Sequence, residues 1–122
     1  MEKGTYVDGF VIVIPKKNAA AYKKMAKMGA KMWRDFGALD YKECRGEDLK
    51  LNMGGVPSRD FKKLTGAKPK EDVWFSFIVY KNKKQRDAIN KKVMKAIGSE
   101  MPEMPFDMRR FSYGGFKVEV SS

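Results

Sequence analysis

Asp8 is the residue of this chain with the clearest potential for acid–base chemistry, because it interrupts a strongly apolar segment. Its neighbours at alternate positions are Tyr6 and Phe10, and loss of water beside them would raise the carboxyl pKa toward a value useful for a general base. A second interpretation stays open, in which an Arg or Tyr side chain satisfies Asp8 and its role is structural. No other residue is a stronger catalytic candidate.

A second polar group, Arg86, Asp87 and Asn90, lies at the start of a predicted helix. Arg86 and Asn90 are four residues apart and share a helix face, while Asp87 suits the positive end of the helix dipole. These side chains either line one mouth of a cavity or serve as capping and ion-pairing groups. We count them as candidate pocket residues.

The C-terminal segment Met104–Phe116 combines an apolar turn, a charged step and an aromatic strand. In the charged step, Asp107 forms an ion pair with Arg109 or Arg110, or one of these arginines binds an anionic group of a ligand. Tyr113 follows and offers a hydroxyl group. We expect these four polar residues to line a pocket rather than to catalyse a reaction.

Cys44 lies between Glu43 and Arg45 and is the single cysteine of the chain. It is either a reactive thiol whose pKa a nearby cation lowers, or a small buried apolar side chain. The chain has no histidine, which excludes Ser-His-Asp and Cys-His nucleophilic systems, proximal-histidine haem ligation and the usual zinc ligand sets. We therefore expect no metal and no cofactor.

Length and composition indicate a single domain over residues 1–122. Apolar residues make up 43% of the chain and aromatic residues 12%, enough for a real core. No apolar run approaches the roughly 20 residues of a membrane span, and the N-terminus lacks the pattern of a signal peptide. A lone cysteine fits a reducing compartment, so we expect a soluble cytoplasmic protein without a membrane partner.

The net charge of +11 comes mainly from lysine, since the 26 basic residues include only six arginines. Lysine is a strongly hydrated point charge, whereas arginine suits specific phosphate contacts. The excess therefore favours a solvated surface over a shaped phosphate site, and nucleic acid is the less favoured partner.

Alternating apolar residues predict strands, and spacings of three and four predict helices. Strands are expected at 5–14, 38–47, 59–65 (a short edge strand), 72–80 and 109–120, the last with a bulge at Gly114-Gly115. Helices are expected at 18–36, capped by Asn18 and ended by Gly37, and at 83–97, ended by Gly98. The segments 48–57 and 100–108 are expected to be a loop and a connector.

The order β-α-β-(β)-β-α-β predicts a ferredoxin-like α+β fold, an antiparallel sheet with both helices on one face. Strands 5–14 and 72–80 are apolar on both faces and are expected at the centre of the sheet. The helices are expected to pack through two apolar stripes: Tyr22, Met25, Ala26, Gly29, Met32, Trp33 and Phe36 in the first, and Ile89, Val93, Ala96 and Ile97 in the second. The other sheet face then needs a partner, most simply a second copy.

The chain resembles the YbaA-like family of small bacterial proteins of unknown function from Tyr6 to Val120. The matching segments are Tyr6-Val7-Asp8-Gly9-Phe10, Phe36-Gly37-Ala38-Leu39, Glu43-Cys44, Phe75-Ser76, Arg86-Asp87-Ala88 with Asn90, and Met104–Phe116. The resemblance implies the dimeric α+β barrel superfamily, in which two ferredoxin-like units close a barrel from two sheets. It implies no particular reaction, and the lack of histidine counts against the haem-degrading branch.

The leading functional hypothesis is a homodimer that binds a small, partly apolar molecule in a pocket lined by aromatic and Met side chains. Cofactor-independent chemistry of the monooxygenase or isomerase kind is an extension of that hypothesis. An alternative is an RNA-binding module that stacks bases on Phe75 and Phe77 of one central strand and on Tyr6 and Phe10 of the other. A third interpretation is a structural or interaction protein without a ligand.

Overall fold

The protein is a single antiparallel sheet with helices packed on it, seen here in a computed structural model that describes residues 4–50, 54–98 and 103–122. The sheet has four strands in the order β2-β3-β1-β4. In chain order the elements are β1 (Tyr6–Pro15), η1 (Lys16–Asn18), α1 (Ala19–Asp35), β2 (Asp40–Arg45), α2 (Phe61–Thr65), β3 (Glu71–Tyr80), α3 (Lys83–Ile97), η2 (Met108–Arg110) and β4 (Phe111–Lys117). The predicted ferredoxin-like α+β topology is confirmed, with β1 and β3 at the centre.

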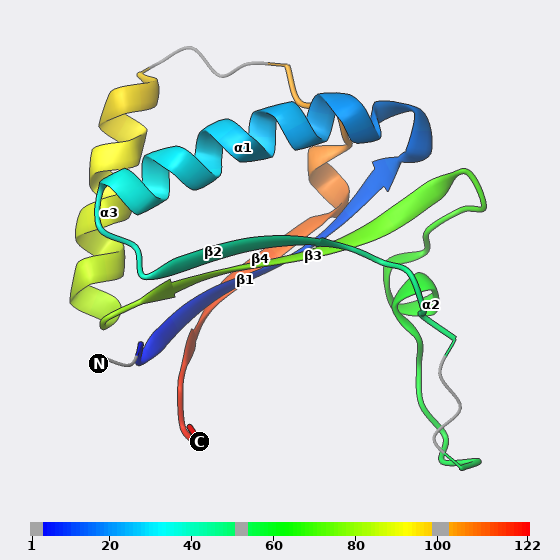
Figure 1. Cartoon of the computed structure of the whole chain (residues 1–122). Helices are drawn as coiled ribbons and strands as arrows, with labels where there is room; N and C mark the ends of the chain where they lie inside the picture. The colour runs from blue at the N-terminus through cyan, green and yellow to red at the C-terminus, as the bar shows by residue number, and fades with distance from the viewer. Residues whose placement is uncertain (1–3, 51–53, 99–102) are drawn as a thin grey trace.

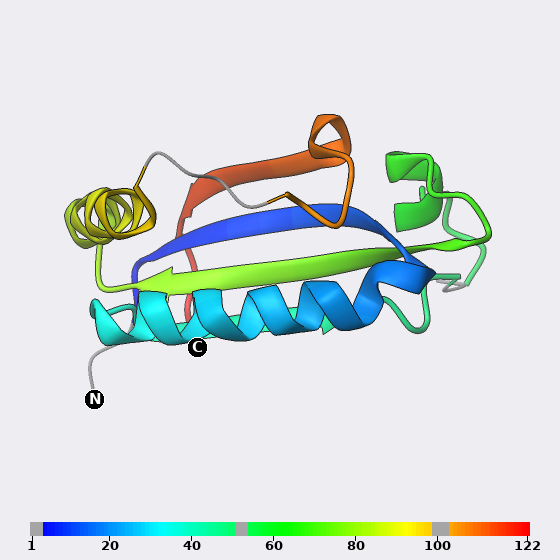
Figure 2. The ribbon, with the colours of Figure 1, turned by 90° about the horizontal axis from the view of Figure 1, so that it is seen from above.

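The two long helices lie on one side of the sheet, and the short helix α2 lies on the other side at one end (Figure 1). Seen from above, α1 runs along the strands and α3 stands at one end of the sheet (Figure 2). No helix in the described residues is long and apolar enough to cross a membrane. The loop predicted at 48–57 and the connector predicted at 100–108 extend in part beyond the described residues.

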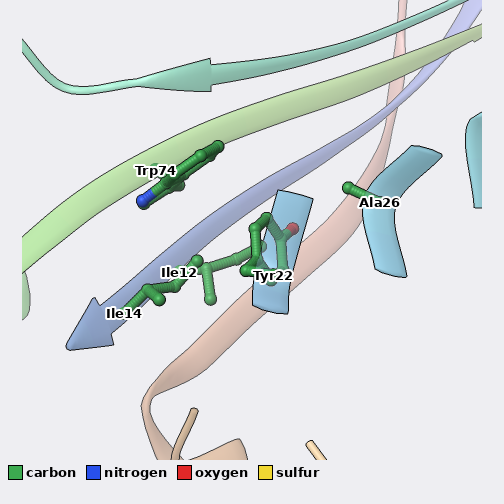
Figure 3. Close-up of a cluster of buried hydrophobic side chains, with 5 residues drawn as sticks. All are labelled: Ile12, Ile14, Tyr22, Ala26 and Trp74. Atoms are coloured by element: carbon green, nitrogen blue, oxygen red, sulfur yellow. The ribbon is translucent and has the colours of Figure 1, made fainter. Parts of the chain in front are cut away.

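The core lies between the helices and the sheet. One cluster joins β1, β3 and α1, with Tyr22 packed edge-on against Trp74 at 5.0 Å between ring centroids (Figure 3). A second cluster joins the other end of the sheet to α3 through Ile89 and Val93, both buried. The apolar stripe predicted for the first helix is confirmed, since Tyr22 and Ala26 are buried and the rest of the stripe is partly buried.

The opposite side of the sheet is apolar and is called here the open face. It comprises alternate residues of the strands, including Val7, Val11, Phe75, Phe77, Val79 and Phe116. On this face, Phe75 is 44% exposed and Phe116 is 56% exposed. The two long helices thus leave a contiguous apolar surface uncovered, as the alternation in the sequence predicts.

The edge strand predicted at 59–65 is wrong, because this segment forms helix α2. The side chain of Asp60 accepts a hydrogen bond from the backbone N–H of Lys63 at 2.8 Å, which caps the first turn. Gly66 ends the helix in the left-handed conformation, with φ of 70°. Two local capping signals therefore outweigh the weak alternation of the segment.

The bulge predicted at Gly114-Gly115 is also wrong. Strand β4 pairs one residue for one residue with β1, so that Asp8 lies opposite Gly115 and Gly9 lies opposite Gly114. The strand begins later than predicted, because residues 108–110 form a 3-10 turn capped by Asp107, and it ends at Lys117 instead of residue 120. Gly115 leaves room for the Tyr6 and Arg86 side chains, whereas a methyl group on Gly114 would make only an ordinary contact with the Phe116 ring.

Two smaller predictions about the helices need correction. Asn18 occupies the N-cap position of α1, but its side chain donates a hydrogen bond to the carbonyl oxygen of Pro105 at 2.9 Å and caps nothing. Ala96 is exposed rather than packed inward, because the inward face of α3 is narrow and runs through Ile89, Val93 and Ile97. The predicted ends at Gly37 and Gly98 agree with the structure, since each follows a helix and has positive φ.

Candidate functional site

Asp8 and Arg86 form the centre of a polar cluster on the helix-covered face of the sheet. Asp8 is 6% exposed, and its Oδ1 lies 3.3 Å from Nε of Arg86 on α3. Burial raises the pKa of the Asp8 carboxyl above its ordinary value, although the nearby Tyr80, Arg86 and Asn90 side chains oppose that shift. The sequence prediction that Asp8 is desolvated is therefore supported, and so is the prediction that an Arg satisfies it.

Arg86 is held by three groups at once, which fixes its orientation. Its Nη2 donates to the hydroxyl of Tyr6 at 3.0 Å and its Nη1 to Asp87 at 3.0 Å, in addition to the contact with Asp8. Gly115, opposite Asp8, provides the space, because a Cβ at this position would overlap both the Tyr6 hydroxyl and the Arg86 guanidinium. The cluster therefore links β1, β4 and α3.

Asn90 completes this cluster from the next turn of α3. Its Oδ1 accepts a hydrogen bond from Nε1 of Trp33 at 3.1 Å, while its side chain also stabilises the charged form of Asp8. Asp87 is more exposed and pairs with Lys83 at 3.2 Å. The N-cap of the helix is Asn82, whose side chain accepts from the backbone N–H of Gln85. Five of the predicted site residues, Tyr6, Asp8, Arg86, Asp87 and Asn90, are thus brought together.

A second carboxylate, Glu43, is partly buried on the same side of the sheet and was not predicted as a site residue. The hydroxyl of Tyr22 donates to it at 2.8 Å and that of Tyr41 at 3.2 Å, and Ser76 also stabilises its charge. Burial raises the pKa of Glu43 above its ordinary value. No ion pair to Glu43 is present among the described residues. The alternation of Tyr41 and Glu43 and the apolar stripe through Tyr22 were the signals that placed them on facing surfaces.

The remaining predicted residues lie away from Asp8. Asp107 pairs with Arg109 at 3.0 Å, and Nη1 of Arg110 contacts Glu71 at 2.6 Å. Tyr113 lies on the helix-covered face, where its ring stacks on Phe111 at 5.2 Å, yet it is 71% exposed. The expected ion pair of Asp107 with an Arg is confirmed.

Two surface hollows lie beside α2, on the side of the open face. The larger has a volume of about 350 Å³ and is lined by Val11, Leu64, Thr65, Arg109, Arg110 and Ser112. The smaller has a volume of about 100 Å³ and is lined by Cys44, Arg45, Gly46, Leu49, Phe61, Val73 and Phe75. Cys44 is exposed here and is not a buried apolar side chain. Neither lining includes a Met, although the sequence suggested one.

The aromatic residues of the two central strands do not form one surface. Phe75 and Phe77 lie on the open face, where their partners on β1 are Val11 and Gly9. Tyr6 and Phe10 lie on the opposite, helix-covered face. A four-residue platform for stacking RNA bases is therefore not present.

No group of three His, Cys, Asp or Glu side chains is arranged to hold a metal ion in residues 4–50, 54–98 and 103–122. The polar clusters instead combine single carboxylates with Tyr, Arg and Asn donors. Such arrangements hold a carboxylate in place and influence its protonation.

Comparison with known sequences identifies the family to which this chain belongs. The profile of DUF1428, a protein of unknown function, matches residues 5–108. The chain belongs to the DUF1428 family. A relative in curated sequences is the uncharacterized protein YbaA of Escherichia coli (strain K12), which is 41% identical over 117 residues, covering 92% of this chain and 94% of the relative. YbaA of Shigella flexneri matches with the same identity and coverage. The resemblance to the YbaA-like family is thereby confirmed.

A solved structure supports the fold assignment. The chain is similar to a crystal structure of a dimeric ferredoxin-like protein from an uncultured marine organism, with a TM-score of 0.54 and 12% sequence identity. The match covers 97% of this chain and 99% of the other. At this identity the likeness establishes the ferredoxin-like fold of the DUF1428 chain and nothing about its reaction.

Proposed function

We propose that this DUF1428 protein is a homodimer, joined through its open faces, that binds a small, partly apolar molecule in the larger hollow beside α2. The observation that carries the proposal is the hollow itself, whose volume of about 350 Å³ lies in the range typical of small-molecule sites. A cytoplasmic location accords with this role, because a lone Cys fits a reducing compartment.

The open face supports the homodimer part of the proposal. Phe75, Phe77 and Phe116 lie on an apolar surface that the two long helices do not cover, and such surfaces are typical of association sites. The ferredoxin-like structure that resembles this chain is described as dimeric. A two-fold arrangement with sheet facing sheet buries the same patch on both copies and closes a barrel.

The chemistry of the hollow supports a ligand with both an apolar and an anionic part. Val11 and Leu64 supply apolar surface and Ser112 supplies a hydroxyl group. Arg109 and Arg110 supply positive charge beside their partners Asp107 and Glu71. Val11 and Ser112 are paired residues of the open face, so a second copy packed on this face would cover the hollow. Exclusion of water would then strengthen the contacts of the arginines with an anionic group.

Asp8 has a different role in this proposal, because its neighbours all come from the protein itself. Arg86, Tyr80 and Asn90 surround the carboxylate, and the larger hollow is lined by other residues. We therefore assign Asp8 the task of fixing α3 on the sheet. Catalysis is not part of the proposal.

Light scattering after size exclusion tests the homodimer. The proposal predicts twice the 14.0 kDa of one chain at micromolar concentration. A stable monomer would contradict it.

Fluorescence of 8-anilinonaphthalene-1-sulfonate, a partly apolar anion, tests the hollow. Leu64→Trp fills the larger hollow and should reduce saturable dye binding about tenfold, whereas Phe61→Trp on the same short helix changes only the smaller hollow. Equal effects of the two substitutions, or no saturable binding, would exclude the larger hollow as the site.

A further inference from the structure

Helices α1 and α3 carry most of the net positive charge of the molecule. Together the two helices contain eleven basic and two acidic residues, out of 26 basic and 15 acidic residues in the chain. Within the part of the chain that the structure describes, seven of their exposed lysines form no ion pair: Lys23, Lys24, Lys27, Lys84, Lys91, Lys92 and Lys95. The excess charge is therefore concentrated on the helical side of the sheet.

This arrangement reduces the stability of the helices. Lysines four residues apart, such as Lys23 with Lys27 and Lys91 with Lys95, repel one another, by about 0.2–0.5 kcal/mol for each pair. Helix α3 begins with Lys83 and has no acidic residue in its first turn, which opposes the helix dipole. Solubility alone requires no such arrangement, because interspersed acidic and basic residues with a smaller net charge achieve it.

We propose that the outer faces of α1 and α3 bind the phosphate backbone of double-stranded nucleic acid without sequence preference. Lysines at a spacing of four residues repeat about every 6 Å along a helix, and a duplex carries closely spaced phosphates along each strand. Lysine contacts phosphates as a point charge and does not read base edges as a forked arginine does. The surface lies on the side away from the open face (Figure 1), so a homodimer would leave it accessible in both copies.

Anionic membranes are the less suitable partner for this surface. Helices that lie in a membrane interface insert large apolar side chains such as Trp, Phe and Leu. The exposed large apolar side chains of α1 and α3 are instead the separate methionines Met28 and Met94. The lysines can contact the phosphates of a nucleic acid in solution without the insertion of an apolar side chain.

Titration of a 20-base-pair DNA duplex of arbitrary sequence, followed by fluorescence anisotropy at several salt concentrations, tests the proposal. Each phosphate contact contributes about 0.9 to the slope of log K against log salt concentration. The variant Lys23→Gln/Lys24→Gln/Lys27→Gln and the variant Lys91→Gln/Lys92→Gln/Lys95→Gln should each reduce the magnitude of this negative slope by about 2 to 3. Glutamine has a helix propensity similar to that of lysine, so both variants should fold.

The matched control removes the same charge from the exposed residues near α2, as Lys63→Gln/Lys68→Gln/Lys70→Gln. It should leave the slope nearly unchanged. Three outcomes would overturn the proposal: no duplex binding at 50 mM salt, equal loss in the control and the helix variants, or binding to phosphatidylserine vesicles without binding to the duplex.

Discussion

Gly115 and Arg86 come from distant parts of the chain, yet a methyl group on the glycine would overlap the guanidinium of the arginine. The same methyl group would overlap the Tyr6 hydroxyl, which accepts a hydrogen bond from Arg86 at 3.0 Å. A side chain at residue 115 would therefore have to displace Arg86 or Tyr6 from the cluster. The glycine belongs to the Asp8 cluster as much as its polar members do.

Gly115→Ala should lower the free energy of unfolding by about 1–3 kcal/mol, because the added methyl group must displace Arg86 or Tyr6. Urea unfolding followed by circular dichroism measures this change. Gly114→Ala is the matched control, since its methyl group would meet only the Phe116 ring at 3.8 Å, an ordinary contact. Equal effects at the two positions would mean that general strand flexibility, and not the cluster, sets the cost.

Arg86→Met should destabilise the protein by about 3 kcal/mol at pH 7, because it leaves the buried carboxylate of Asp8 without its cation. The loss should be smaller near pH 5, where Asp8 takes up a proton more readily, since burial already raises its pKa. The double variant Asp8→Asn/Arg86→Met should recover part of the loss. Additive effects in this double-mutant cycle would contradict direct coupling of the two side chains.

Glu43→Gln should change how stability depends on pH. The folded-state pKa of Glu43 lies above its ordinary value of 4.5, so its favourable contribution is present below pH 4.5 and is lost as the pH rises through the folded-state pKa. Glutamine does not titrate. The stability of the variant relative to the unmodified protein should therefore increase between pH 4.5 and pH 7, as thermal unfolding across this range would measure.

The exposed position Glu103 supplies the control for this experiment. Glu103→Gln removes one carboxyl group at this exposed position and so controls for the loss of a charge. A flat profile for Glu43→Gln would show that Glu43 titrates alike in the folded and unfolded chains.

Phe75→Lys should dissociate the proposed homodimer, weakening association by about a hundredfold or more, since two-fold symmetry places the new charge in the interface from both copies. Sedimentation equilibrium measures the change. Tyr113→Lys adds the same charge at a position that is 71% exposed on the opposite face, and it should leave association intact. A dimer that persists in Phe75→Lys would place the interface elsewhere.

The sequence by itself determined the architecture, because its information is local and periodic. Two-residue alternation identified β1 and β3 as strands apolar on both faces, and the spacing of Tyr22 and Ala26 identified the buried stripe of α1. Short-range capping was harder to judge, and the segment 59–65 was assigned to a strand although Asp60 and Gly66 bracket a helix. Family membership followed from matches spread along the chain.

Only the tertiary structure decided which polar residues meet, because such contacts depend on strand register and helix placement. Asp8 and Arg86 are 78 positions apart in the numbering. Because Asp8 pairs with Gly115, which has no side chain, the guanidinium of Arg86 has room beside Asp8. Packing of the whole chain also brings the hydroxyls of Tyr22 and Tyr41 to Glu43. The sequence did not identify Glu43 as a site residue. Periodicity fixes the face on which a side chain lies, whereas its neighbours on that face depend on the packing of the whole chain.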